Sequence, residues 1–179
     1  SRGFMGTHAA TTIPRDDGKG VAWDFAALDR LKGPAPASVN PSLWRHSLLL
    51  AKHGLFRVSD RVFQVRGFDL SVMTVIEGDS GIVIIDPLIS RETAAAGLAL
   101  YRAQRGTERP VLGVVYSHSH IDHFGGVLGV TTAADVAEGR CAVLAPAGFM
   151  DEAVAENVYA GTAMTRRATY MYGAALPKN

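Results

Sequence analysis

Residues 110–127, "PVLGVVYSHSHIDHFGGV", join an apolar run to a dense group of titratable side chains. The first half is rich in β-branched residues and predicts a buried strand. Three of the six histidines of the chain follow within six residues, and a pair of glycines comes next. We therefore expect a strand that delivers polar side chains at its carboxyl end, which is where open α/β sheets place their functional sites.

The polar group of this stretch consists of His118, His120, Asp122 and His123. Alternate residues of an extended segment point to the same side, so His118 and His120 can converge on one point. Asp122 and His123 can face a second point nearby. Imidazole nitrogen and carboxylate oxygen are ligands that zinc prefers. The spacing H-x-H-x-D-H therefore predicts a metal-binding loop and not a polar surface loop.

The rest of the chain alternates strand and helix signals. β-branched and aromatic runs predict strands over 61–67, 70–78, 81–87 and 140–146, with a hairpin turn at "GDSG" (residues 78–81). The run "GIVIIDP" is apolar throughout, so we expect it to be buried on both faces. Helices are predicted over 40–54, capped by Asn40 and ended by Gly54, over 91–105, ended by Gly106, and over most of 148–172, with an interruption at Gly161. This order predicts an α/β sandwich in which a mixed sheet carries helices on its outer face.

Two segments are predicted from composition. Residues 1–40 are rich in Gly, Pro, Ala and Thr without a clear period, and we expect an extended N-terminal arm with a short helix near 23–31. Residues 41–179 hold the predicted strands and the histidine loop and form the second segment.

The overall composition excludes some classes of function. Apolar residues make up 47% and charged residues 20%, which is ordinary for a globular protein. The net charge of +1 does not indicate a protein that binds nucleic acid or an anionic membrane. No apolar run is long enough to span a bilayer. The single cysteine, Cys141, cannot form an internal disulfide, and the compartment is left open.

Asp86 ends the apolar run "GIVIIDP". A carboxylate at the end of a buried strand needs hydrogen-bond partners, and the neighbouring histidine loop offers backbone and imidazole N–H groups. We therefore predict that Asp86 lies behind the metal ligands and orients them.

The spacing H-x-H-x-D-H after a buried strand resembles the metallo-β-lactamase superfamily. The resemblance implies the αββα sandwich, with only its N-terminal half in this chain, so that residues 41–179 would be the N-terminal part of a catalytic domain. It also implies that His118 and His120 hold one zinc ion, and that Asp122 and His123 hold a second.

Further stretches are similar to the alkyl sulfatase branch of that superfamily. They are "NPSLWRHSLLLAKHGLFRV", "VRGFDLSVMTVIEGDSGIVIIDPLIS" and "ENVYAGTAMTRRATYMYGAALP". This resemblance implies a bacterial dinuclear zinc enzyme that hydrolyses alkyl sulfates such as dodecyl sulfate to alcohol and inorganic sulfate. The attacking group would be a metal-bound hydroxide oriented by Asp122. Arg166 or Arg167 could face the sulfate, although both also suit an ordinary charged surface.

Alternatives stay open at this point. One is another hydrolase of the same fold, such as a lactonase or a thioesterase, and another is a diiron redox protein. A metal-free binding module is disfavoured by the intact ligand spacing.

The resemblance also implies features outside residues 1–179. These are a homodimer formed through a helical domain, a lipid-carrier-like C-terminal domain, and the remaining metal ligands on a downstream segment. Glu152 and Glu156 are the only glutamates late in the chain. Their spacing suits a solvated or pocket-rim helix face, and we do not assign them as ligands.

Overall fold

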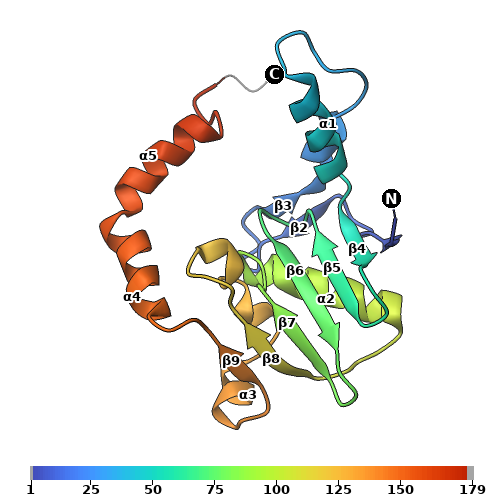
Figure 1. Ribbon diagram of the computed structural model, residues 1–179, viewed down its shortest axis with the longest axis vertical. Coiled ribbons are helices and arrows are strands. Elements are labelled where there is room, and N and C mark those ends of the chain that lie inside the picture. The colour runs from blue at the N-terminus through green and yellow to red at the C-terminus, as the bar shows by residue number, and fades with distance from the viewer. Residues whose placement is uncertain (1, 177–179) are drawn as a thin grey trace.

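The computed structural model describes residues 2–176, which form one mixed seven-stranded sheet and a separate two-stranded hairpin (Figure 1). The strand order of the large sheet is β1-β4-β5-β6-β7-β8-β9. Its strands are β1 (Phe4–Gly6), β4 (Gly54–Arg57), β5 (Val62–Arg66), β6 (Val72–Glu77), β7 (Ile82–Ile85), β8 (Val111–Val115) and β9 (Ala142–Leu144).

The middle of the sheet follows chain order. Strands β4 to β7 pair antiparallel with their neighbours, and the turn between β6 and β7 closes where the Gly78 amide donates to the Gly81 carbonyl at 2.8 Å. Strands β7 and β8 are parallel and are joined by the crossover helix α2 (Arg91–Arg105), as parallel neighbours require. Strand β9 adds parallel to β8. The predicted strands, the hairpin and the mixed α/β class are confirmed.

Helix α2 covers one face of this sheet and forms the core with it (Figure 1). The fully buried Tyr101 packs its ring edge-on against Phe63, with the ring centroids 5.8 Å apart. Local signals set both ends of the helix. The Ser90 hydroxyl accepts from the Thr93 amide at the start. Gly106 adopts the left-handed conformation at the end, where the sequence predicted the helix to stop.

The opposite face of the sheet is less covered. Ile82 and Ile84 of β7 are fully buried, whereas Val83 and Ile85 are only half-buried. Successive side chains of a strand point to opposite faces, and α2 covers only the face that Ile82 and Ile84 occupy. The prediction that residues 81–87 are buried on both faces is therefore wrong for Val83 and Ile85.

The N-terminal segment is more ordered than its composition indicated. Strand β1 pairs with β4 at the edge of the large sheet. Strands β2 (Thr12–Pro14) and β3 (Val21–Asp24) form the separate hairpin, and a 3-10 helix, η1 (Phe25–Arg30), follows. Ile13 and Phe25 belong to the hydrophobic core. The prediction of a loop-like surface arm is wrong for these stretches. Apolar residues that follow no helical or strand period can still pack into the core of the tertiary structure. The boundary at residue 40 stays a prediction.

Helix α1 (Pro41–Leu50) starts as predicted and ends earlier. The Asn40 side chain accepts from the amide of Ser42 at 2.9 Å, but the helix ends at Ala51 and not at Gly54. Gly54 instead begins β4 with a φ of 142°, and a Cβ there would lie 2.3 Å from the carbonyl oxygen of Gly6. This glycine is therefore used for the close approach of β1 and β4.

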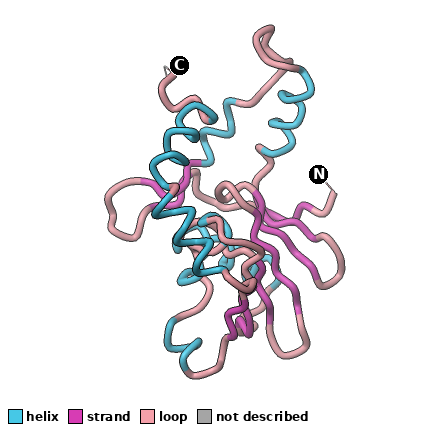
Figure 2. Tube along the Cα trace, turned by 60° about the vertical axis from the view of Figure 1, so that its left-hand side comes forward, coloured by secondary structure: helices cyan, strands magenta, loops and turns pink. Residues whose placement is uncertain are grey.

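The C-terminal helical run leaves the sheet after β9. It comprises α4 (Phe149–Val154), a π-helical turn η4 (Ala155–Tyr159) and α5 (Gly161–Met171). Both views show it extending toward the end of the molecule that carries α1 (Figures 1 and 2). The predicted break near Gly161 is confirmed. No helix within residues 2–176 is both long and apolar enough to cross a membrane.

Candidate metal centre

The three histidines of the predicted loop gather at the carboxyl end of β8. A single 3-10 turn, η2 (Ile121–His123), reverses the chain after His120. The ring centroid of His118 lies 4.6 Å from that of His120 and 4.0 Å from that of His123. The structure therefore brings the imidazoles together, on a loop supported by the parallel end of the sheet.

Asp86 is the main support behind this loop. It follows β7, is 8% exposed, and adopts a left-handed backbone conformation with a φ of 55°. Its carboxylate accepts from the Ser117 amide (2.8 Å) and the Ser117 hydroxyl (2.6 Å), and contacts Nδ1 of His123 (2.8 Å). These are the kinds of partner that the sequence predicted. Its role toward a metal stays a prediction.

The same contacts determine which ring nitrogen of two histidines faces outward. The Ser117 hydroxyl donates to Asp86, so it can accept from Nδ1 of His118, which lies 2.9 Å away. Nδ1 of His123 donates to Asp86. In both rings Nδ1 carries the hydrogen, and Nε2 is the nitrogen available to a metal.

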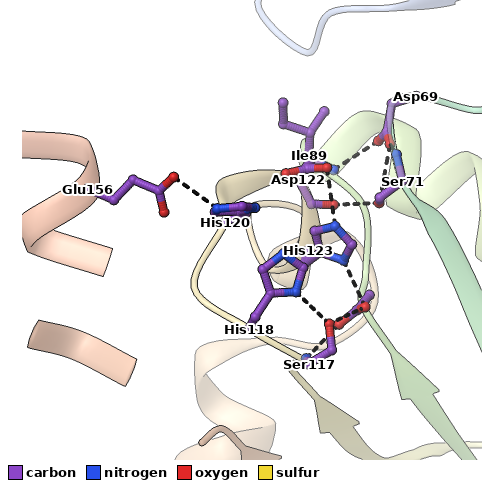
Figure 3. Close-up of polar contacts among 10 residues, drawn as sticks. Asp69, Ser71, Ile89, Ser117, His118, His120, Asp122, His123 and Glu156 are labelled. Carbon is purple, nitrogen blue, oxygen red and sulfur yellow. Dashed lines mark hydrogen bonds and ion pairs between the residues drawn. The ribbon is translucent and has the colours of Figure 1, made fainter. Parts of the chain in front are cut away.

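Asp122 is held through its backbone and its side chain. Its carboxylate lies 3.3 Å from Nε2 of His123. Its carbonyl accepts from the Ser71 hydroxyl at 2.5 Å (Figure 3). Ser71 is fixed in turn by Asp69, whose carboxylate accepts from the Ser71 amide (2.9 Å) and the Ile89 amide (2.9 Å). Burial raises the pKa of Asp69, and the nearby charge of Asp122 adds to that effect. The metal loop is thus tied to the start of β6.

The glycine pair after the histidines allows the loop to lie directly on the strand end. The Gly126 amide donates to the Leu88 carbonyl at 2.9 Å. A Cβ on Gly126 would lie 2.1 Å from the Pro87 carbonyl oxygen. A larger residue would therefore push the loop away from the end of β7.

The donor set suits zinc by its chemistry, since three imidazoles and a carboxylate are typical zinc ligands. Because Nδ1 of His118 and of His123 is hydrogen-bonded, each ring can offer the lone pair of Nε2 to a metal, and in His123 this nitrogen lies beside the Asp122 carboxylate. Within residues 2–176, no three His, Cys, Asp or Glu side chains already form a metal-binding group. The assignment of His118, His120, Asp122 and His123 as ligands therefore stays a prediction.

Sequence reasoning missed three neighbours of the loop. Ser71 and Ser117 are common residue types with no diagnostic spacing, and Glu156 was interpreted as part of a helix surface. Glu156 instead places Oε1 3.0 Å from Nε2 of His120 (Figure 3). Arg166 and Arg167 are exposed on α5.

An apolar groove of about 820 Å³ lies between α1, η1 and the turn that joins β5 to β6. Leucine, valine and aromatic side chains provide most of its wall, including Leu28, Leu49, Leu50, Phe56, Leu70 and Val72. Lys52 and Arg66 add basic groups, and Asp69 and Ser71 also line it. Because Ser71 also bonds Asp122, the groove and the metal loop share a border.

Comparison with known proteins matches residues 66–176 to the Metallo-beta-lactamase superfamily. A linear primary-alkylsulfatase of Pseudomonas sp. is 51% identical over 178 residues, which cover 98% of this chain and 26% of that protein. An alkyl/aryl-sulfatase of Saccharomyces cerevisiae is 47% identical over 97% of this chain and 27% of its own length.

A solved structure is also similar throughout the chain. The stereoselective inverting sec-alkylsulfatase Pisa1 from Pseudomonas sp. aligns with a TM-score of 0.87 and 48% identity, covering 99% of this chain and 28% of that one. The chain spans about a quarter of the length of the relatives that it matches.

Proposed function

The chain belongs to the metallo-beta-lactamase superfamily, and from this premise we propose that its protein hydrolyses alkyl sulfate esters to an alcohol and inorganic sulfate with two zinc ions. One observation carries the proposal. About half of the residues are identical to those of alkylsulfatases, over nearly the whole chain. The aligned stretch covers nearly the whole chain and so includes the segment that folds into the histidine loop and its supports.

In this proposal His118 and His120 hold one zinc ion, and Asp122 and His123 hold the other. When bound, zinc supplies Lewis-acid activation of water and of the sulfate ester. The chain's own groups hold the ligands in place. Asp86 fixes the ring of His123 at 2.8 Å, and Asp122, itself held by Ser71, orients the attacking water.

The groove beside the loop suits the remainder of such a substrate. An alkyl sulfate has a permanent anion at one end and an apolar tail. The leucine and valine side chains of the groove can bury the tail, and Lys52 and Arg66 can attract the anion. Homodimer formation, and further metal ligands outside residues 1–179, stay predictions.

One experiment tests both the activity and the bond that breaks. The full-length protein is incubated with dodecyl sulfate in water enriched in heavy oxygen, and sulfate and dodecanol are analysed by mass spectrometry. We expect metal-dependent release of sulfate. Label in sulfate would mean that water attacks sulfur, and label in the alcohol would mean that it attacks carbon. If zinc-loaded protein releases no sulfate, the proposed function is wrong.

A further inference from the structure

A carboxylate from the C-terminal helical run reaches the histidine loop from the side opposite to the sheet. Oε1 of Glu156, in η4, lies 3.0 Å from Nε2 of His120 (Figure 3). The Glu156 side chain is 26% exposed, whereas its neighbours Asp151 and Glu152 are exposed. Among the acidic residues of this run, Glu156 is the one turned toward the loop.

The packing of α4 explains why Glu156 arrives at this position. The ring of Phe149, at the start of α4, packs against Tyr116 (5.3 Å between centroids) and Phe124 (5.1 Å), which flank the histidines on either side. Glu156 follows Phe149 by seven residues, which is about two helical turns, so both side chains leave the helix on the same face. The aromatic contact therefore fixes the position of α4 relative to the histidine loop and places the Glu156 side chain next to His120.

The helix also widens where Glu156 lies. In η4 the Ala160 amide donates to the Ala155 carbonyl at 3.0 Å, five residues back, and the Asn157 side chain donates to the Ala153 carbonyl at 2.8 Å. Single π-helical turns of this kind occur often at functional sites. The turn keeps its backbone groups bonded while it presents the carboxylate.

Each imidazole of the loop has one ring nitrogen within hydrogen-bond distance of a protein oxygen that is not itself a candidate metal ligand. The partner is Ser117 for His118 and Asp86 for His123, both through Nδ1. For His120 the held nitrogen is Nε2, and the partner is Glu156. A histidine that binds a metal through one nitrogen commonly donates the other N–H to a carboxylate, which fixes the ring and strengthens the ligand.

We propose that Glu156 is a positioning residue for His120. Its carboxylate accepts the Nε2–H hydrogen, so that Nδ1 carries the lone pair offered to the metal, whereas His118 and His123 offer Nε2. The inference rests on the metal-binding part of the proposed function and does not depend on which ester is hydrolysed.

The first test is zinc affinity, measured by competition with a chromophoric chelator on the full-length protein. Glu156→Ala should raise the zinc dissociation constant about 10- to 100-fold, the usual effect of losing such a partner. Glu156→Gln keeps an oxygen that can accept the hydrogen bond from His120, so its zinc affinity should lie between those of the wild type and Glu156→Ala. If the alanine variant folds poorly, the glutamine variant provides the measurement instead. Glu152→Ala, one turn earlier and exposed, is the matched control and should bind zinc as the wild type does. An unchanged dissociation constant in Glu156→Ala would overturn the proposal.

The second test is a crystal structure of the zinc-loaded full-length protein. We expect Nδ1 of His120 on zinc and Nε2 within hydrogen-bond distance of Glu156. Coordination through Nε2, or Glu156 turned away from His120, would also refute the assignment. If the wild type binds zinc but releases no sulfate from dodecyl sulfate, the proposed function fails while the role of Glu156 is still decided by these two measurements.

Discussion

Nδ1 of His123 lies 2.8 Å from Oδ2 of Asp86, a residue 37 positions earlier in the chain. The contact joins the end of β7 to the loop that follows β8, so the two parallel strands and the candidate ligands form one unit. Asp86 keeps this position with a φ of 55°, which is uncommon for a residue other than glycine and is tolerated best by Asn and Asp.

Asp86→Asn should therefore preserve the backbone while removing the charge and half of the acceptor capacity. The amide would meet donors from both His123 and Ser117, so one donor loses its partner. We expect a zinc affinity about 10- to 100-fold lower, and a free energy of unfolding lower by about 1–3 kcal/mol. Chelator competition and urea denaturation measure the two effects. Asp79→Asn is the control, because the Asp79 side chain is 90% exposed. Wild-type zinc affinity in Asp86→Asn would contradict the supporting role.

The metal content of the purified full-length protein should be about two zinc ions per chain, because His118 with His120 and Asp122 with His123 form two pairs of candidate ligands. Elemental analysis by mass spectrometry gives the ratio, and dialysis against a chelator should abolish sulfate release until zinc is restored. Predominant iron with visible absorption would favour the redox alternative instead.

Replacing any one of His118, His120, Asp122 and His123 by alanine should lower turnover by orders of magnitude and leave the fold intact. The side chains lie on a loop outside the hydrophobic core, where substitutions usually cost little stability. Initial rates with dodecyl sulfate measure the loss of turnover, and thermal denaturation shows whether the fold is intact. Wild-type turnover in His120→Ala would exclude it as a ligand.

Activity should rise with the length of the alkyl chain for short substrates. Each buried methylene contributes about 0.8 kcal/mol, or about a fourfold gain in kcat/KM. The comparison uses butyl, hexyl and octyl sulfates below saturation. Leu70→Asp, in the groove wall, should flatten the trend, whereas the exposed Leu128→Asp should not. Equal kcat/KM values for all chain lengths in the wild type would speak against an apolar tail site.

The stability of the sheet should depend on pH through Glu77. Its carboxylate accepts from Arg105 Nε at 2.7 Å and from the Tyr101 hydroxyl at 2.8 Å. The bond from Arg105 lowers the pKa of Glu77 below its ordinary value of 4.5. A lowered pKa in the folded state stabilises the protein above pH 4.5, and this contribution is lost as the pH falls through the lowered value.

Glu77→Gln should therefore reduce the melting temperature at neutral pH. Between about pH 5 and 3 the melting temperature of this variant should decrease less than that of the wild type. Thermal denaturation across this range measures both effects, with the exposed Glu108→Gln as the control. Parallel pH profiles for the wild type and Glu77→Gln would show that another group controls the acid transition.

Features set by neighbouring residues were predictable from the sequence. The spacing of His118, His120, Asp122 and His123 indicated a metal-binding loop from strand geometry and ligand chemistry, and the β-branched runs, the cap at Asn40 and the helix end at Gly106 act within one or two turns. Asp86 was also predictable, because a carboxylate that ends a buried strand must find partners nearby. Gly54 was predicted to end α1 because glycine is common at helix ends, but in the structure this glycine begins β4 and allows β1 to approach it closely.

The tertiary structure alone decided which distant groups meet the loop. Ser71 bonds Asp122 across 51 residues, and Glu156 contacts His120 from a helical run whose Phe149 packs against Tyr116 and Phe124. The pairing of β1 with β4 is of the same kind. Local patterns specify dihedral angles and the face that a residue occupies. Contacts between segments far apart in the chain depend on how whole surfaces pack, and no short stretch of sequence contains that information.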